Sequence, residues 1–210
     1  MSFHPEILQG AQTGVLRQLS PLVSPRQFYL GGGTALALHL GHRLSVDLDW
    51  FTPEKIADPL RLAQELRDEG APFVTGSTAR GTLHGMMEGV RLSFIEYHYP
   101  LLEPLVSWPE FGCHLASMAD LACMKLSAVA QRGSRKDFID IYALGTNGFS
   151  LHEMLAMHQR KYSVKDISHV LYGLAYFDDA DKERGLKLLR DIDWQVVKKT
   201  IQGWVREVAG

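Results

Sequence analysis

Hydrophobic residues at helical spacing predict two helices in the first 70 residues. The first apolar stripe begins at Ile7 and continues to Leu19. The second lies within residues 53–69, and polar residues separate its apolar positions. The inward face of this second helix is predicted to contain Ile56, Leu60, Ala63 and Leu66. Each helix should therefore bury one face against the rest of the protein.

The chain between and after these helices carries the patterns of strands. Residues 28–30 are an aromatic and apolar run that stops at three glycines, 31–33. Residues 34–40 favour a short helix, and residues 45–51 then alternate apolar and acidic side chains as a strand does. Residues 73–99 contain β-prone stretches broken by glycines, and we expect two or three antiparallel strands there.

After three prolines between residues 100 and 109, the signals become helical. Three serines are followed three residues later by an acidic residue, which is the pattern of a capping box. These pairs are Ser117 with Asp120, Ser150 with Glu153, and Ser163 with Asp166. Residues 194–208 also have a helical pattern. We therefore predict an α+β fold, with a mixed sheet and flanking helices in residues 1–110 and a helical C-terminal region in residues 111–210.

Composition narrows the class of protein. The chain has 210 residues, 46% of them hydrophobic, and a formal net charge of -2, a composition that excludes wholesale disorder. Because there is no general excess of basic residues, any binding of nucleic acid must use a local basic patch. Its two cysteines, Cys113 and Cys123, are too few for a disulfide scaffold or a four-thiolate zinc site. The sequence carries no signal-peptide pattern and no apolar run of membrane-spanning length, so we expect a cytoplasmic protein with no membrane partner.

Residues 28–51 hold the most informative chemistry. Asp47 and Asp49 are two apart on a predicted strand, so their carboxylates should point the same way about 7 Å apart. Two such carboxylates repel each other unless a cation lies between them. A pair of oxygen ligands suits Mg²⁺ that is also bound by substrate phosphates, with Mn²⁺ as an alternative. The glycines at 31–33 lie at the start of the predicted helix over residues 34–40. Backbone N–H groups at a helix start have no partner within the helix and are open to an anion. The combination predicts a site for a nucleoside triphosphate.

Other glycine and aspartate motifs do not fit this segment. A P-loop requires Gly-Lys-Ser/Thr, which is missing after the glycines. A dinucleotide-binding turn requires a third small residue where Leu36 stands. A haloacid-dehalogenase-like phosphatase usually has Thr or Val where this chain has Phe51.

Three blocks of sequence resemble the AbiEii/AbiGii toxin family of nucleotidyltransferase-like proteins. They are GGTALAL at residues 32–38, RLSVDLDWF at 43–51 and MKLSAVAQRGSRKDFIDIYAL at 124–144. The first two blocks are fairly specific together, and the third in this order makes the match strong. The resemblance implies a nucleotidyltransferase-like core followed by a helical region, in a family with members that act as toxins of toxin–antitoxin pairs.

The resemblance assigns nucleotide contacts to particular residues. Gly32, Gly33 and Thr34 would contact nucleotide phosphates, and Lys125 would contact the nucleotide. Lys125 also fits a lysine that extends along an otherwise apolar helix to reach water. Arg132 belongs to a small basic cluster that suits a phosphate or RNA contact as well as it suits a solvated helix end.

The resemblance also assigns the carboxylates. Asp47 and Asp49 would hold the metal, and an aspartate in the third block would complete the site. Asp137 and Asp140 both qualify, and we slightly prefer Asp140. Glu96, in the predicted strand over residues 90–99, loosely matches the third carboxylate of other nucleotidyltransferases.

These assignments predict attack of an acceptor hydroxyl on the α-phosphorus of a nucleoside triphosphate. The acceptor by resemblance is RNA, particularly tRNA, with protein or a small molecule as alternatives. A cognate antitoxin is the expected partner of a toxin. The alternative hypothesis is a non-catalytic relative of the same fold that binds a nucleotide or RNA.

Overall fold

The structure, a computed structural model, describes residues 3–210 and is built around one mixed seven-stranded sheet. The strands lie in the order β3-β4-β5-β2-β1-β7-β6. Their bounds are β1 Tyr29–Gly31, β2 Leu48–Thr52, β3 Val74–Ala79, β4 Thr82–Met87, β5 Val90–Glu96, β6 Val106–Trp108 and β7 Cys113–Leu115. β3, β4 and β5 pair antiparallel, as the sequence predicted for residues 73–99.

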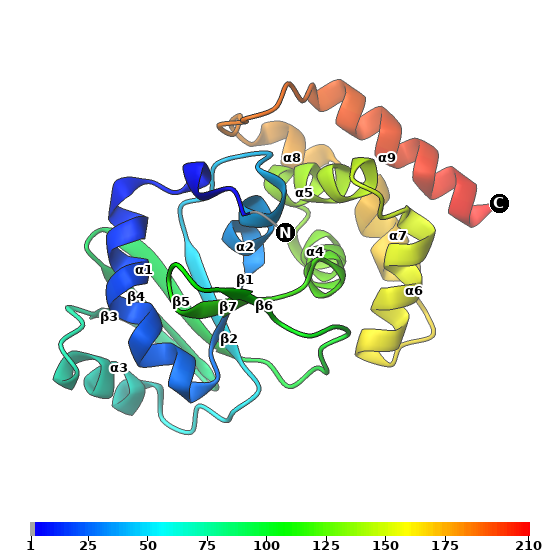
Figure 1. Cartoon of the computed structure of the whole chain (residues 1–210). Helices are drawn as coiled ribbons and strands as arrows, with labels where there is room; N and C mark the ends of the chain where they lie inside the picture. The colour runs from blue at the N-terminus through cyan, green and yellow to red at the C-terminus, as the bar shows by residue number, and fades with distance from the viewer. Residues whose placement is uncertain (1–2) are drawn as a thin grey trace.

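Helices flank the sheet, and loops connect them to the strands. The α-helices are α1 Gly10–Val23, α2 Gly32–Leu40, α3 Pro59–Asp68, α4 Met118–Arg132, α5 Arg135–Thr146, α6 Leu151–Tyr162, α7 Ser168–Ala175, α8 Asp178–Lys182 and α9 Trp194–Ala209. Two short 3-10 helices cover Pro5–Ile7 and Ser24–Arg26. Figure 1 shows α1 and α3 on one side of the molecule and the helices from α4 onward gathered on the other.

The centre of the sheet brings the predicted chemical segment together. β1 is antiparallel to β2, and Gly31 is the register partner of Asp49. β2 is parallel to β5, where Asp49 pairs with Ser93. α2 begins directly after β1 and ends at Gly41, whose left-handed backbone (φ +60°) suits glycine. The glycine turn therefore lies next to the strand that carries the aspartate.

The two faces of β3–β5 differ in burial. On one face Leu83, Leu92 and Phe94 are buried beneath α1 and α3. On the other face His84, Met86 and Arg91 are exposed, as period-two alternation requires. One predicted position in α3 was wrong: Leu60 is 59% exposed, whereas Leu62 lies inward with Ala63 and Leu66. The helix begins at Pro59, so its buried stripe is shifted from the predicted one.

The C-terminal helices follow two of the three predicted caps. Ser117 accepts from the backbone N–H of Asp120, and Ser150 forms a capping box with Glu153. The predicted cap at Ser163 was wrong, because Ser163 ends α6 in a left-handed conformation and α7 begins at Ser168. β7 pairs with β1 beyond residue 110, so the sheet continues past the expected boundary before α4 begins.

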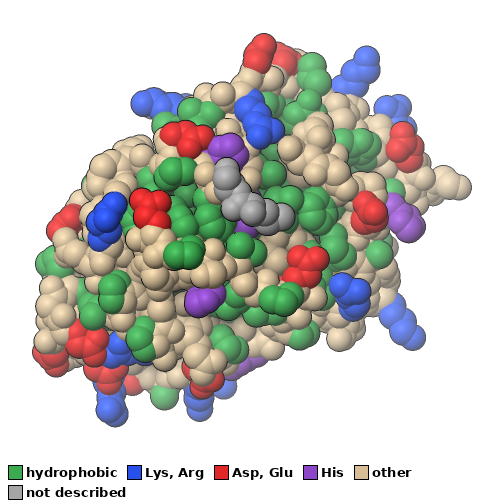
Figure 2. Space-filling view, viewed as in Figure 1, with side chains coloured by type: hydrophobic (Ala, Val, Ile, Leu, Met, Phe, Trp, Pro, Cys, Tyr) green, Lys and Arg blue, Asp and Glu red, His purple; other side chains and the backbone are tan. Residues whose placement is uncertain are grey.

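The segment between α8 and α9 returns to the loop that follows α2. Leu44 N–H donates to the carbonyl of Lys187, and Leu189 N–H donates to the carbonyl of His42. Residues of both halves also belong to one hydrophobic core. The C-terminal region therefore holds the loop after α2, which leads to Asp47 and Asp49, in place. Figure 2 shows charges of both signs scattered over one face, in keeping with the net charge of -2. Within residues 3–210, no helix combines the length and apolar character needed to cross a bilayer.

Candidate active site

A cavity of 440 Å³ lies between α4 and the sheet face formed by β2 and β5. The glycine turn, both aspartates and the predicted lysine all reach it. Its lining residues are Gly32, Gly33, Arg43, Ser45, Asp47, Asp49, Phe51, His84, Ser93, Ile95, Tyr97, Met124, Lys125, Ser127, Ala128, Gln131, Arg132, Lys136 and Tyr162. Most of the predicted site residues are thus brought into one place.

The glycines of the turn are required by two close contacts. A Cβ atom on Gly32, where φ is +64°, would come within 2.5 Å of Asp49 Oδ2. A Cβ atom on Gly33 would come within 2.7 Å of Arg43 Nη2. These positions let a carboxylate and a guanidinium approach the N-terminus of α2, where backbone N–H groups can receive an anion.

Asp47 and Asp49 form the acidic side of the cavity. Both are half-buried and both line it, as the sequence predicted from their spacing. Asp47 lies just before β2, and its Oδ1 accepts from Nε of Arg91 at 2.7 Å. The carboxylates therefore meet at the end of β2 that faces the glycine turn.

Thr34 has a different place from the one predicted for it. Its side chain is buried and does not line the cavity. Its hydroxyl contacts Ser45 Oγ at 2.8 Å and the backbone carbonyl of Asp47. Thr34 thus ties α2 to the approach of β2, and Ser45 is the hydroxyl that reaches the cavity. Thr34 was expected to contact phosphate, but in the structure it holds the segment that carries Asp47.

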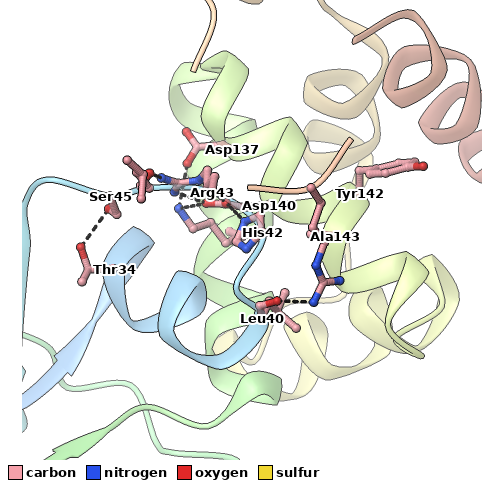
Figure 3. A network of polar contacts seen from close by, with 12 residues as sticks. Thr34, Leu40, His42, Arg43, Ser45, Asp137, Asp140, Tyr142 and Ala143 are labelled. Atoms are coloured by element: carbon pink, nitrogen blue, oxygen red, sulfur yellow. Dashed lines mark hydrogen bonds and ion pairs between the residues drawn. The ribbon is translucent and has the colours of Figure 1, made fainter. Parts of the chain in front are cut away.

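Asp140 is the centre of a buried polar network (Figure 3). It is fully buried, and Arg43 donates to both of its oxygens, through Nε at 2.7 Å and Nη2 at 2.8 Å. Lys125 Nζ lies 2.6 Å from Oδ2, and His42 Nε2 lies 2.7 Å from Oδ1. A carboxylate only accepts, so His42 donates through Nε2. Asp140 does not line the cavity.

Asp137 has a similar role and lies a helical turn before Asp140. It is fully buried, and Arg132 donates to it through Nε at 2.7 Å and Nη2 at 2.9 Å. Lys125 Nζ donates at 3.1 Å and Ser134 Oγ at 2.7 Å. Asp137 and Asp140 therefore orient the cavity's cations and lie outside the cavity. The sequence left open which of Asp137 and Asp140 belongs to the site. In the structure both lie behind the cavity and support its cations.

The network fixes the charge states of its members. Burial alone would raise the pKa of Asp140, but Arg43 and Lys125 outweigh it and hold that pKa well below its usual range. Burial likewise opposes ionisation of Asp137, and Arg132 and Lys125 still lower its pKa. Burial lowers the pKa of His42 despite its bond to Asp140, so the imidazole is neutral.

Counting charges shows what the network presents to the cavity. Arg43, Lys125 and Arg132 supply three positive charges against two negative ones from Asp137 and Asp140, an excess of one. All three cations line the cavity, while both carboxylates stay behind it. The cavity therefore has a cationic wall, formed by Arg43, Lys125 and Arg132, in addition to its aspartate pair.

Glu96 is not brought to the aspartates. Its carboxylate accepts from the backbone N–H of Ile56 and contacts His98, and it is absent from the cavity lining. Alternation along β5 points Glu96 away from the face that carries Ser93 and Ile95. The residue beside Asp49 on this strand is Ser93, so the expectation for Glu96 was wrong. Within the described residues, no group of three His, Cys, Asp or Glu side chains is placed to hold a metal.

Sequence reasoning missed the apolar and aromatic end of the cavity. Phe51, Tyr97 and Tyr162 line it, and the two tyrosine hydroxyls hydrogen-bond at 2.7 Å. Two periodic signals could have found this wall. Ser93 and Ile95 alternate along β5 and Tyr97 continues this spacing just after it, and one face of α4 carries Met124, Ser127, Ala128 and Gln131. The contribution of Tyr162 from α6 required the three-dimensional fold.

Comparison with known structures places this arrangement in the nucleotidyltransferase fold. MenT4, a nucleotidyltransferase toxin of Mycobacterium tuberculosis H37Rv, superposes with a TM-score of 0.56 and 16% identity, over 94% of this chain and 83% of that one. JHP933 of Helicobacter pylori superposes with a TM-score of 0.53 and 15% identity, over 94% and 88% of the two chains. At these identities, the similarity shows the fold.

The family comes from sequence comparison. The family model described as "Nucleotidyl transferase AbiEii toxin, Type IV TA system" matches residues 14–203. An uncharacterized protein of Aquifex aeolicus (strain VF5) is 36% identical over 204 residues, covering 95% of this chain and 97% of that protein. The chain belongs to the AbiEii nucleotidyl transferase toxin family, as the three sequence blocks predicted.

Proposed function

We propose that the protein transfers a nucleoside monophosphate from a nucleoside triphosphate to an acceptor hydroxyl. One observation carries this proposal: two aspartates and four cationic side chains, Arg43, Lys125, Arg132 and Lys136, converge on a single cavity at a glycine turn. Gly32 and Gly33 offer the start of α2 to phosphate, and Arg43, Lys125 and Arg132 compensate its charge. Family membership supports the same class of reaction.

The proposed reaction balances as a simple displacement. The acceptor oxygen bonds to the α-phosphorus, the bond from that phosphorus to the bridging oxygen of the β-phosphate breaks, and pyrophosphate leaves. The proton of the acceptor hydroxyl passes to solvent. Arg43, Lys125 and Arg132 stabilise the charge that develops on the leaving group because the buried aspartates hold them in place before the substrate arrives.

Mg²⁺ fits the residues present. Asp47 and Asp49 line the cavity together, and Mg²⁺ is commonly held by one or two carboxylates with substrate phosphates and water completing its shell. Mn²⁺ has the same ligand preference. When bound, such an ion supplies charge neutralisation and orients the phosphates. Asp47 and Asp49 are the residues that would hold it.

The acceptor and the partner are proposed on the family resemblance. RNA, particularly tRNA, is the proposed acceptor class. A cognate antitoxin is the proposed protein partner, because the family description names a toxin–antitoxin system. The alternative is a non-catalytic relative that binds a nucleotide or RNA. It is favoured because Ser93 lies beside Asp49, while Glu96, the expected third carboxylate, lies elsewhere.

Radiolabel transfer tests the proposal. Each of the four α-³²P nucleoside triphosphates is incubated with the protein, MgCl₂ and total RNA as the probe acceptor. We expect one or more labels to enter RNA with wild type, and about a hundredfold less with Asp49→Asn. Asp68→Asn, an exposed change on α3, is the matched control and should transfer normally.

Two results would count against the proposal. Equal labelling by wild type and Asp49→Asn would show that the transfer does not use Asp49. Triphosphate binding with no transfer to RNA, protein or small hydroxyl compounds would favour the non-catalytic alternative.

A further inference from the structure

A second groove of 440 Å³ meets the cavity at the aspartate pair. Its lining residues are Asp47, Asp49, Gly76, Ser77, His84, Gly85, Met86, Arg91, Leu92 and Ser93. Asp47, Asp49, His84 and Ser93 belong to both hollows. From these shared residues, the groove extends over β5 and β4 to β3, away from Lys125 and Arg132 on α4. The aspartates thus stand where two binding spaces join.

Within residues 3–210, α3 packs on one face of β3 and β4, and the groove lies on the other face of these two strands. α1 packs against β5, and the groove side carries exposed side chains from all three strands. A bulge at Gly76 interrupts the pairing of β3 with β4, and the residues there are small. A sheet face with exposed side chains beside a reactive centre is open to a second substrate.

The groove's side chains have a particular chemistry. Arg91 is 68% exposed, and His84 presents an aromatic ring whose Nδ1 lies 3.2 Å from Ser93 Oγ. Met86 is 45% exposed and adds apolar surface. Cationic and flat or apolar groups on an open sheet face suit the phosphates and bases of a single strand. A peptide more often adds a strand at a sheet edge, which is a different surface from this one.

We propose that this groove receives the acceptor as the single-stranded end of a nucleic acid, with Arg91 binding one of its phosphates. The inference rests on the proposed transfer function. That reaction needs an acceptor hydroxyl at the α-phosphorus in line with the leaving pyrophosphate. With the triphosphate on the cationic wall, the groove supplies an approach to the aspartates from the other direction.

Arg91 is well placed for a double role. Its Nε donates to Asp47 Oδ1 at 2.7 Å, which holds the guanidinium beside the point where the acceptor hydroxyl must arrive. Its remaining N–H groups can donate to a phosphate, since a guanidinium has five donors. Arg91 is therefore a binding and positioning residue for the acceptor.

Oligonucleotide binding tests the groove separately from the nucleotide site. The probes are fluorescein-labelled single strands of RNA and of DNA, about 12 nucleotides long to span a site of ordinary size, titrated with the full chain by anisotropy, with and without Mg²⁺ and a triphosphate. Arg91→Ala should weaken binding about tenfold, the worth of one charge-assisted hydrogen bond, and reduce the salt dependence by about one phosphate contact. Ser77→Glu adds a negative charge in the groove without touching Asp47 and should weaken binding as much.

The controls separate this inference from the function beneath it. Arg17→Ala removes an arginine of similar exposure (61%) on α1 and should change nothing. Triphosphate binding, measured on the same samples, should survive Ser77→Glu. Strands of RNA or DNA that bind wild type, Arg91→Ala and Ser77→Glu equally would overturn the groove assignment, as would failure of wild type to bind either strand at low salt. Failure of wild type to bind any triphosphate would instead overturn the proposed function.

Discussion

Two pairs of aspartates lie within one site and have opposite surroundings. Asp47 and Asp49 are half-buried on the cavity wall, where a substrate or ion can reach them. Asp137 and Asp140 are fully buried and are held by Arg43, Lys125 and Arg132. The same side chain is thus the proposed metal ligand in one place and an anchor for cations in the other. Solvent access and the number of cationic partners make the difference.

The comparison predicts its largest effect on stability at Asp140. Asp140→Asn should lower the free energy of unfolding by about 3–5 kcal/mol, because Arg43 and Lys125 would remain buried with too little compensating charge. Urea unfolding at pH 7 measures this change. If Asp140→Asn were as stable as wild type, the buried network would not support the fold as described.

Asp49→Ala should produce the reverse pattern. Transfer activity should fall about a hundredfold, since a group at the reacting phosphates is lost. The free energy of unfolding should stay within about 1 kcal/mol of wild type, because removing a half-buried carboxylate leaves no cation unpaired in the core. The same urea titration and a transfer assay on one preparation give both values. If Asp49→Ala were strongly destabilised, the claim that this aspartate pair contributes little to stability would be wrong.

Arg43→Lys should fall between these extremes. Lysine keeps the charge but cannot donate to both oxygens of Asp140 or lie flat beside Gly33. We expect triphosphate affinity to fall about tenfold and the free energy of unfolding to fall by about 1–2 kcal/mol. Calorimetric titration with a triphosphate, beside thermal unfolding, checks both. Unchanged affinity would mean that Arg43 only supports the fold.

Acid should remove stability in two stages. Burial lowers the pKa of His42, and it lowers the pKa of His158 to about 4, so below pH about 6.5 the unfolded chain takes up protons that the fold excludes. The pKa values of Asp137 and Asp140 are also lowered, so their contribution is complete above pH about 4 and is lost as the pH falls further. Unfolding titrations at several pH values should show a decline from pH 7 to 5, and a steeper one below 4. A flat profile from pH 7 to 5 would contradict the neutral buried histidines.

The smallest expected effect is at Glu96. Its carboxylate points away from the cavity, so Glu96→Gln should change Mg²⁺-dependent triphosphate binding less than about twofold, within the range of an ordinary surface substitution. Isothermal titration beside wild type decides this. A large loss would restore Glu96 as a ligand and would require movement of β5.

The sequence predicted the features of this site that depend on local patterns. The glycine turn and the acidic strand follow from short-range spacing, whereas the lysine of α4 was assigned from the family resemblance. The order of the three sequence blocks identified the family. The resemblance pointed to Asp137 or Asp140 as a site residue, but no sequence pattern indicated that both lie behind the cavity. That distinction depends on burial and on partners such as Arg43, which is almost a hundred residues away in sequence.

Glu96 and Thr34 show why individual residues were harder to predict. A shift of one residue along a strand moves a side chain to the other face, so Ser93 and Ile95 face the cavity while Glu96 does not. Thr34 follows Gly32 and Gly33 in the chain, but a helix turns successive side chains by about 100° and directs its hydroxyl to Ser45 and Asp47. Tertiary packing decided both outcomes.

Calorimetric binding of nucleoside triphosphates tests the central claim most directly. Wild type and Asp47→Ala/Asp49→Ala are each titrated with the four triphosphates, with and without Mg²⁺. The structure predicts Mg²⁺-dependent binding of at least one triphosphate by wild type and its loss in the double variant, with both proteins folded. Equal binding by the folded double variant, or binding indifferent to Mg²⁺, would contradict the assignment of the aspartate pair.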